Sequence, residues 1–192
     1  GPHSPYLCPP EFLREVAAEA RRLGLGCHIH VSETAEQVRA SRERHGLTPI
    51  RLLEQLGMLD GPLLCAHATH ATPDEIALLA ERGAGVAHCP KTFLKLAAGI
   101  APVVEMRRQG VGVGVGSDGA ASNNTLDMLE QLRLAALLQK HQLADARALR
   151  SWRTSQSWTK HSAIARRAAS VASAVRNGAS AAASSASGTR MS

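Results

Sequence analysis

Short apolar runs and longer amphipathic stretches alternate along the first 150 residues. Apolar runs of four or five residues predict buried strands, and apolar residues three or four positions apart predict the helices between them. The predicted strands span residues 27–31, 63–66, 84–88 and 111–115, and the predicted helices span 9–24, 38–56, 72–83, 102–110 and 126–138. The pattern therefore predicts a strand–helix unit repeated four times.

Repeats of this kind favour an α/β fold with a parallel sheet and right-handed crossovers. Four units make roughly half of a TIM-like (β/α)8 barrel, which has about 250 residues. A doubly wound sheet is the structural alternative. It would carry a glycine-rich phosphate loop after its first strand, and the segment 28–34 bears no likeness to such a loop.

Two of the predicted helices carry more specific expectations. Thr72 precedes a Pro-Asp-Glu start, and Glu75 follows it by three residues, so the two side chains are expected to form a capping box. The helix predicted over 126–138 has a strongly amphipathic pattern.

The chain changes character near residue 150. Residues 1–150 form the predicted partial barrel, whereas residues 151–192 contain 22 Ala or Ser and no Asp or Glu. We interpret 151–192 as a low-complexity tail, which is either an out-of-frame translation of a GC-rich gene or a natural disordered segment. Sequencing of the source DNA would separate these two hypotheses.

The net charge of +6 originates in this tail, which holds six of the 22 basic residues and none of the 16 acidic ones. Residues 1–150 carry no net charge and few aromatic residues, which argues against a nucleic-acid groove. No apolar run is long enough to cross a membrane, and no secretory pattern is visible. The four cysteines form no C-x-x-C pair. We expect reduced thiols and a cytoplasmic protein.

Each predicted strand ends in a side chain that can bind a metal or move a proton. His30, His67, His88 and Asp118 follow the four strands in that order. Because the loops after parallel barrel strands meet on one face, these side chains are expected to converge. Glu33 lies three residues after His30, so both are expected to lean over one cavity. His88 either faces that cavity or packs in the core.

These residue types suit a metal or proton-transfer site. A histidine nitrogen is a good zinc ligand, and a nearby carboxylate can carry protons for a metal-bound water. Asp118 follows a strand of only Val and Gly, the pattern of a fully buried strand. Its carboxylate is therefore expected to be hydrogen-bonded, paired or metal-bound.

Longer motifs accompany these residues, in order, over most of residues 1–140. They are 1–6 (GPHSPY), 28–34 (HIHVSET), 66–67 (AH), 88–90 (HCP), 94–96 (LKL), 99–103 (GIAPV) and 117–124 (SDGAASNN). Together they resemble the amidohydrolase superfamily, in its branch of nucleobase, adenosine-type and triazine deaminases and chlorohydrolases. The chain is most similar to the 5-methylthioadenosine/S-adenosylhomocysteine deaminases.

The resemblance implies a metal-dependent hydrolase that deaminates a small, purine-like heterocycle and releases ammonia. His30 and Asp118 would bind a divalent metal, in the first place zinc, with Fe, Mn or Ni as alternatives. Glu33 would pass a proton to the ring nitrogen of the substrate. His67 would position the attacking water or the leaving group, and Asp118 would take the proton from the water.

The resemblance also implies substrate contacts for His3, His67 and Ser122. A triazine-type chlorohydrolase or aminohydrolase, with the same metal and a different pocket, is the enzymatic alternative. The sequence leaves oligomerisation open, and it indicates no nucleic-acid or membrane partner.

Two features depart from the family pattern. The first barrel strand of the family supplies an H-x-H metal pair, and no such strand precedes Gly1. His30 and Asp118 are fewer than the three protein ligands usual for catalytic zinc. Residues 91–93 read Lys-Thr-Phe, where the methylthioadenosine branch usually has a small-residue and asparagine pattern. We therefore expect the C-terminal half of a barrel, with an inactive half-barrel that has two unpaired sheet edges as the non-enzymatic alternative.

Overall fold

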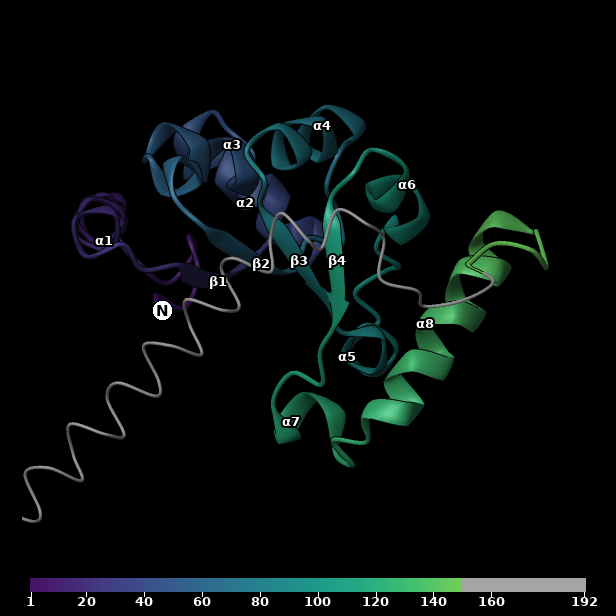
Figure 1. Cartoon of the computed structure of the whole chain (residues 1–192). Helices are drawn as coiled ribbons and strands as arrows, with labels where there is room; N and C mark the ends of the chain where they lie inside the picture. Colours follow the sequence, from purple (N-terminus) through teal and green to yellow (C-terminus); the bar gives the residue numbers. More distant parts are fainter. Residues whose placement is uncertain (150–192) are drawn as a thin grey trace, which may run out of the picture.

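The computed structural model describes residues 1–149, which contain a sheet of four parallel strands (Figure 1). The strands are β1 (Cys27–Val31), β2 (Leu63–His67), β3 (Gly85–His88) and β4 (Gly112–Val115). They lie side by side in sequence order. A doubly wound sheet instead reverses its order at a switch point. The sequential order is that of an arc of a (β/α)8 barrel, as predicted.

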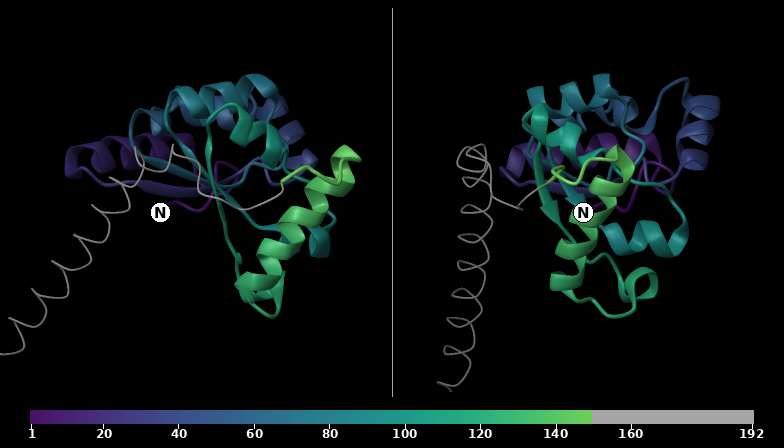
Figure 2. Two further views of the ribbon diagram at one scale, coloured as in Figure 1. Left: turned by 45° about the vertical axis from the view of Figure 1, so that its right-hand side comes forward. Right: turned by 90° about the vertical axis from the view of Figure 1, so that its right-hand side faces the viewer.

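Helices connect the strands. The first four are α1 (Pro10–Leu23), α2 (Ala35–His45), α3 (Pro49–Gln55) and α4 (Pro73–Glu81), with a short 3-10 helix, η1 (Met58–Asp60), before β2. The remaining helices are α5 (Pro90–Leu96), α6 (Val103–Arg108), α7 (Ala120–Asn123) and α8 (Met128–Leu143). In Figures 1 and 2, α4 and α6 lie on one side of the sheet, whereas α5, α7 and α8 gather beyond the carboxyl end of β4. The sequence pattern had predicted neither α5 nor α7.

Capping boxes fix where two of these helices begin. The capping box predicted for α4 is present, with Thr72 Oγ1 accepting from Glu75 N and Glu75 Oε2 accepting from Thr72 N. A second capping box joins Thr34 and Gln37 at the start of α2. The second box matters for the site, because it holds the chain directly after β1 in a defined conformation.

The hydrophobic core lies on one face of the sheet. Its strand residues alternate along each strand and include Ile29, Val31, Cys65, Val86 and Val113. The opposite face would line the interior of a barrel, and there Leu64 is 40% exposed. Because side chains alternate along a strand, His28 and His30 lie on this uncovered face.

Helix α8 lies where the sequence pattern predicted a helix, and it extends further, to Leu143. Its buried residues are Gln131, Ala135 and Gln139, four residues apart, whereas Leu129 and Leu137 are 77% and 52% exposed. The most buried face of α8 therefore carries two glutamines and an alanine, and Leu134 and Leu138 are half-buried.

Hydrogen bonds explain why glutamines face inward on α8. Gln131 Oε1 accepts from the backbone N–H of Lys91 at 3.1 Å, and Gln139 Oε1 accepts from that of Val104 at 3.2 Å. Both N–H groups lie in the first turn of a helix, where no backbone acceptor is available within the helix. The two glutamines therefore anchor α5 and α6 to α8.

Among residues 1–149, no helix has the length and apolar character that crossing a bilayer requires. The predictions for the tail over 151–192 concern residues outside the described part of the chain.

Candidate functional site

Three predicted site residues come together at the strand ends. His30, His67 and Asp118 each offer one metal-ligating atom, and these atoms lie within 4.8 Å of one another. The ring centroids of His30 and His67 are 5.3 Å apart. The sequence had assigned only His30 and Asp118 to the metal. The structure adds the His67 imidazole as a third donor within reach.

His30 is held with one ring nitrogen free. Its Nδ1 lies 2.8 Å from the carbonyl oxygen of His3, which can only accept, so Nδ1 carries the proton and donates it. The backbone N–H of His30 donates to the same oxygen at 2.9 Å. In a neutral imidazole, Nε2 then keeps its lone pair and can bind a metal.

His67 is buried, and its ring nitrogens have no hydrogen-bond partner among the described residues. Its backbone has a φ of 71°, a left-handed conformation that is uncommon for a residue other than glycine. Burial lowers the pKa of its imidazole, although the negative charges of Glu33 and Asp118 act in the opposite direction. A buried neutral imidazole without a hydrogen bond is costly unless it finds a partner, such as a metal ion or a substrate atom.

The donor set therefore fits a divalent metal. Two imidazoles with available lone pairs and one carboxylate are ligand types that zinc uses, and three protein ligands are usual where a fourth position stays open for chemistry. The fit rests on the free nitrogen of His30, the unsatisfied ring of His67 and the proximity of Asp118.

Glu33 lies beside this cluster and is fixed from two sides. The Tyr6 hydroxyl donates to Glu33 Oε2 at 3.2 Å, and Gln37 Nε2 donates to the same oxygen at 3.3 Å. The other oxygen, Oε1, lies 3.9 Å from His67 Nε2. Burial, together with the charge of Glu33, raises the pKa of Tyr6 well above its usual range, so its hydroxyl stays a donor.

Asp118 is held in an uncommon conformation by hydroxyl groups. Its backbone φ is 58°. Ser122 Oγ and Thr92 Oγ1 donate to its Oδ2 at 2.8 and 3.0 Å. Burial acts to raise the pKa of Asp118, but the hydrogen bonds from Ser122, the Gly119 backbone and Thr92 outweigh it and lower the pKa below its usual value. The carboxylate is therefore ionised at neutral pH.

The structure also brings His3 to the cluster. Its ring stacks on that of His30, with centroids 4.5 Å apart and an interplanar angle of 18°. Ser122 touches Asp118 rather than standing apart from it. His88 is buried, lies 5.2 Å from the Phe93 ring between centroids, and is not among the three grouped donors. This position agrees with the packing alternative for His88.

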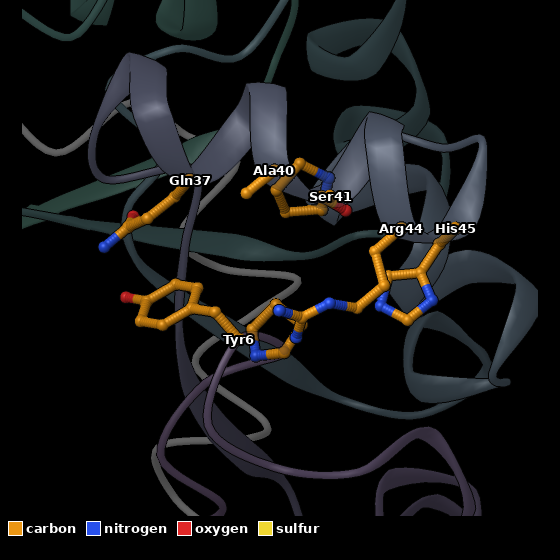
Figure 3. Close-up of a pocket in the computed structure, with 8 residues that line it drawn as sticks. Tyr6, Gln37, Ala40, Ser41, Arg44 and His45 are labelled. Atoms are coloured by element: carbon orange, nitrogen blue, oxygen red, sulfur yellow. The ribbon is translucent and has the colours of Figure 1, made fainter.

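A pocket opens next to the site, between residues 5–6 and α2 (Figure 3). Its lining includes Tyr6, Gln37, Ser41, Arg44 and His45, and it does not include the three donors. The ring of Tyr6 lines the pocket while its hydroxyl reaches Glu33. The pocket and the site therefore share a wall.

Sequence reasoning had assigned no role to Tyr6, Gln37 or Thr92. Tyr6 belongs to the GPHSPY motif, which was one available signal, and Gln37 could be found as the third residue of a capping box after Thr34. Thr92 lies 26 residues before Asp118, and no local pattern links the two.

The fold and the site define an α/β protein with a candidate metal centre at the carboxyl ends of a parallel half-barrel. The model of the amidohydrolase family matches residues 1–184, and the chain belongs to this family. The recognition drawn from the motifs is thereby confirmed.

The chain is also similar in sequence to named proteins. The chain is 54% identical over 140 residues to the 5-methylthioadenosine/S-adenosylhomocysteine deaminase of Moorella thermoacetica, a match that covers 73% of this chain and 33% of the relative. It is 47% identical over 165 residues to the protein of the same name from Pelotomaculum thermopropionicum, covering 86% of this chain and 38% of the relative. The chain thus spans about a third of these relatives.

Solved structures agree with the fold. An adenosine deaminase from Xanthomonas campestris with bound zinc superposes with a TM-score of 0.74 at 42% identity, over 77% of this chain and 34% of that chain. The atrazine chlorohydrolase TrzN from Arthrobacter aurescens, complexed with zinc, gives a TM-score of 0.66 at 34% identity, over 74% and 31%.

Proposed function

We propose that this chain carries the C-terminal half of the active site of a metal-dependent aminohydrolase. The reaction replaces an exocyclic amine of a purine-like heterocycle, of the methylthioadenosine or adenosylhomocysteine type, with oxygen and releases ammonia. The observation that carries the proposal is the grouping of His30, His67 and Asp118 within 4.8 Å, beside Glu33. The identity to named deaminases supports the type of substrate.

His30, Asp118 and His67 would hold the divalent metal, and zinc suits their nitrogen and oxygen donors best. The zinc in the solved structures of two relatives supports this choice. When bound, such an ion lowers the pKa of a water ligand toward about 7 and so supplies a nucleophile at neutral pH.

Two carboxylates divide the proton transfers in this proposal. Asp118, ionised through its hydroxyl donors, accepts the proton of the attacking water. Glu33 delivers a proton to the ring nitrogen of the substrate. Its Oε2 is held by Tyr6 and Gln37, which leaves Oε1 on the side of His67 to reach the substrate.

Three further side chains supply the remaining contacts. His67, with its pKa lowered by burial, orients the water or the departing ammonia without adding a positive charge. His3, stacked on His30, and Ser122, next to Asp118, contact the substrate.

The test is ammonia release by the full-length gene product from methylthioadenosine, adenosylhomocysteine, guanine and cytosine. Glu33→Gln should lower kcat by about 100-fold or more, because general acid–base catalysis contributes at least that much. Glu36→Gln, an exposed position on α2, is the matched control and should leave kcat unchanged. Absence of turnover with every heterocycle would count against the proposal.

Hydrolysis of a chloro- or amino-triazine is the second candidate, favoured by the likeness to atrazine chlorohydrolase. Chloride release from a chlorotriazine, measured in the same panel, separates it from deamination. An inactive half-barrel remains the non-enzymatic alternative. It predicts neither ammonia release nor stoichiometric zinc in the 192-residue chain.

A further inference from the structure

Helix α5 holds the loop that carries Asp118. Lys91 Nζ donates to Thr125 Oγ1 at 2.8 Å and pairs with Glu130 Oε2 at 2.6 Å. One turn later, Lys95 Nζ donates to the Asn124 side chain at 2.6 Å and to the backbone carbonyl of residue 121. Two lysines from the third βα unit thus tie down the segment that follows the fourth strand.

Thr92 lies between these two lysines and reaches the carboxylate itself. Its side chain is fully buried, and its Oγ1 donates to Asp118 Oδ2 at 3.0 Å. Ser122 Oγ donates to the same oxygen at 2.8 Å. Among the described residues, no side chain donates to the other oxygen, Oδ1.

The neighbouring Phe93 supports the histidine side of the cluster. Its ring lies 5.7 Å from that of His67 in an edge-on arrangement and 5.2 Å from that of His88, between centroids. Residues 91, 92 and 93 therefore contact α8, Asp118 and His67 respectively.

We propose that Thr92 is a positioning residue that, together with Ser122, fixes Oδ2 of Asp118 and leaves Oδ1 available to a bound cation. The inference rests on the proposed metal site. A left-handed residue on a loop has no ladder of backbone hydrogen bonds to orient its side chain, so the orientation has to come from such contacts. Ser122 belongs to the same loop as Asp118, whereas Thr92 belongs to α5 and fixes the carboxylate relative to the neighbouring βα unit.

The test compares three variants of the 192-residue chain. Thr92→Val keeps the shape and removes the donor, and Thr92→Ser keeps the donor. Thr69→Val makes the same change at a buried threonine whose Oγ1 has no hydrogen-bond partner within residues 1–149. Zinc affinity is measured by competition with a chromophoric chelator. Thr92→Val should weaken binding by roughly tenfold, the lower end of the range for residues that orient metal ligands. Thr92→Ser and Thr69→Val should retain wild-type affinity.

Cobalt substitution adds a readout that a merely structural role would not change. The visible absorption bands of the Co²⁺-loaded chain should alter in Thr92→Val and return in Thr92→Ser. Unchanged affinity and bands in Thr92→Val would overturn the positioning role while leaving the metal site intact.

Crystal structures of the variants test the positioning role of Thr92 even if the chain binds no metal. A wild-type chain without affinity for Zn²⁺ or Co²⁺ would contradict the proposed metal site. The positioning role would then be judged by the Asp118 side chain, which should rotate in Thr92→Val and return in Thr92→Ser. An unmoved carboxylate in Thr92→Val would overturn it.

Discussion

The imidazole of His30 donates its Nδ1 proton to the carbonyl oxygen of His3, 2.8 Å away. This bond selects the tautomer of the ring. Together with the backbone N–H of His30, which donates to the same oxygen, it links the segment before α1 to the end of β1. Nε2 is left with a lone pair beside His67 and Asp118. The candidate metal centre therefore depends on a backbone atom far from His30 in the sequence as well as on the side chains.

Removal of a donor should abolish the metal site. Asp118→Asn and His67→Ala should each lower zinc affinity by more than about 100-fold, beyond the loss typical of residues that only orient a ligand. The exposed His141→Ala is the control, because its imidazole lies on α8 away from the cluster. Metal content by mass spectrometry after dialysis measures the effect. Full zinc content in Asp118→Asn would exclude this residue as a ligand.

Tyr6 should resist ionisation. It is the only tyrosine of the chain, so tyrosinate absorbance near 295 nm reports on it alone. Burial and the charge of Glu33 raise its pKa, and the folded chain should show little tyrosinate at pH 10–11, where a free tyrosine titrates. Glu33→Gln should bring the titration to lower pH. Because the folded state keeps this proton longer than the unfolded state, stability should fall as pH rises above about 10. Ordinary titration near pH 10 in the folded wild type would contradict the structure.

His88 should make the protein sensitive to acid. Burial, with a smaller contribution from His67, lowers the pKa of His88 to about 3, whereas an unfolded histidine titrates near 6.5. Between these values the unfolded state binds more protons, so the free energy of unfolding should decrease as pH falls from about 6.5 toward 3. His88→Gln should reduce the loss between pH 6 and 4 by about 1–3 kcal/mol. Urea denaturation at several pH values measures it, and parallel curves for the two proteins would disprove the assignment.

Gln139 should matter more for stability than its surface neighbours on α8. It is buried, and it bonds both the Val104 N–H and the carbonyl oxygen of Ala101, at 3.2 and 2.9 Å. Gln139→Leu leaves the Val104 N–H unsatisfied and removes one of the two donors of the Ala101 carbonyl, which keeps the Val103 N–H, and it should cost about 1–3 kcal/mol. Gln142→Leu removes an exposed bond to the Ile100 carbonyl and a 3.3 Å bond from Gln139 Nε2, leaves the bonds of Gln139 to Val104 and Ala101 in place, and should cost less than about 0.5 kcal/mol. Equal losses in the free energy of unfolding for the two variants would show that burial of these hydrogen bonds adds no stability.

The sequence by itself determined the local architecture. Short apolar runs located all four strands, and Thr72 with Glu75 located the start of α4. Both were predictable because strand burial and helix capping depend on residues a few positions apart. It also determined that His30, His67 and Asp118 end consecutive or nearby strands, and a parallel sheet brings such ends to one edge.

Only the tertiary structure decided the arrangement within that edge. The left-handed backbone at His67 redirects its ring, and the contact of Thr92 with Asp118 spans 26 residues. The leucine-rich pattern of α8 likewise does not indicate that its glutamines are buried. They face inward because they accept hydrogen bonds from backbone N–H groups of α5 and α6. Periodicity records which residues share a face of an element. It does not record which hydrogen-bond donors another element presents to that face, and this is set by packing between segments distant in the chain.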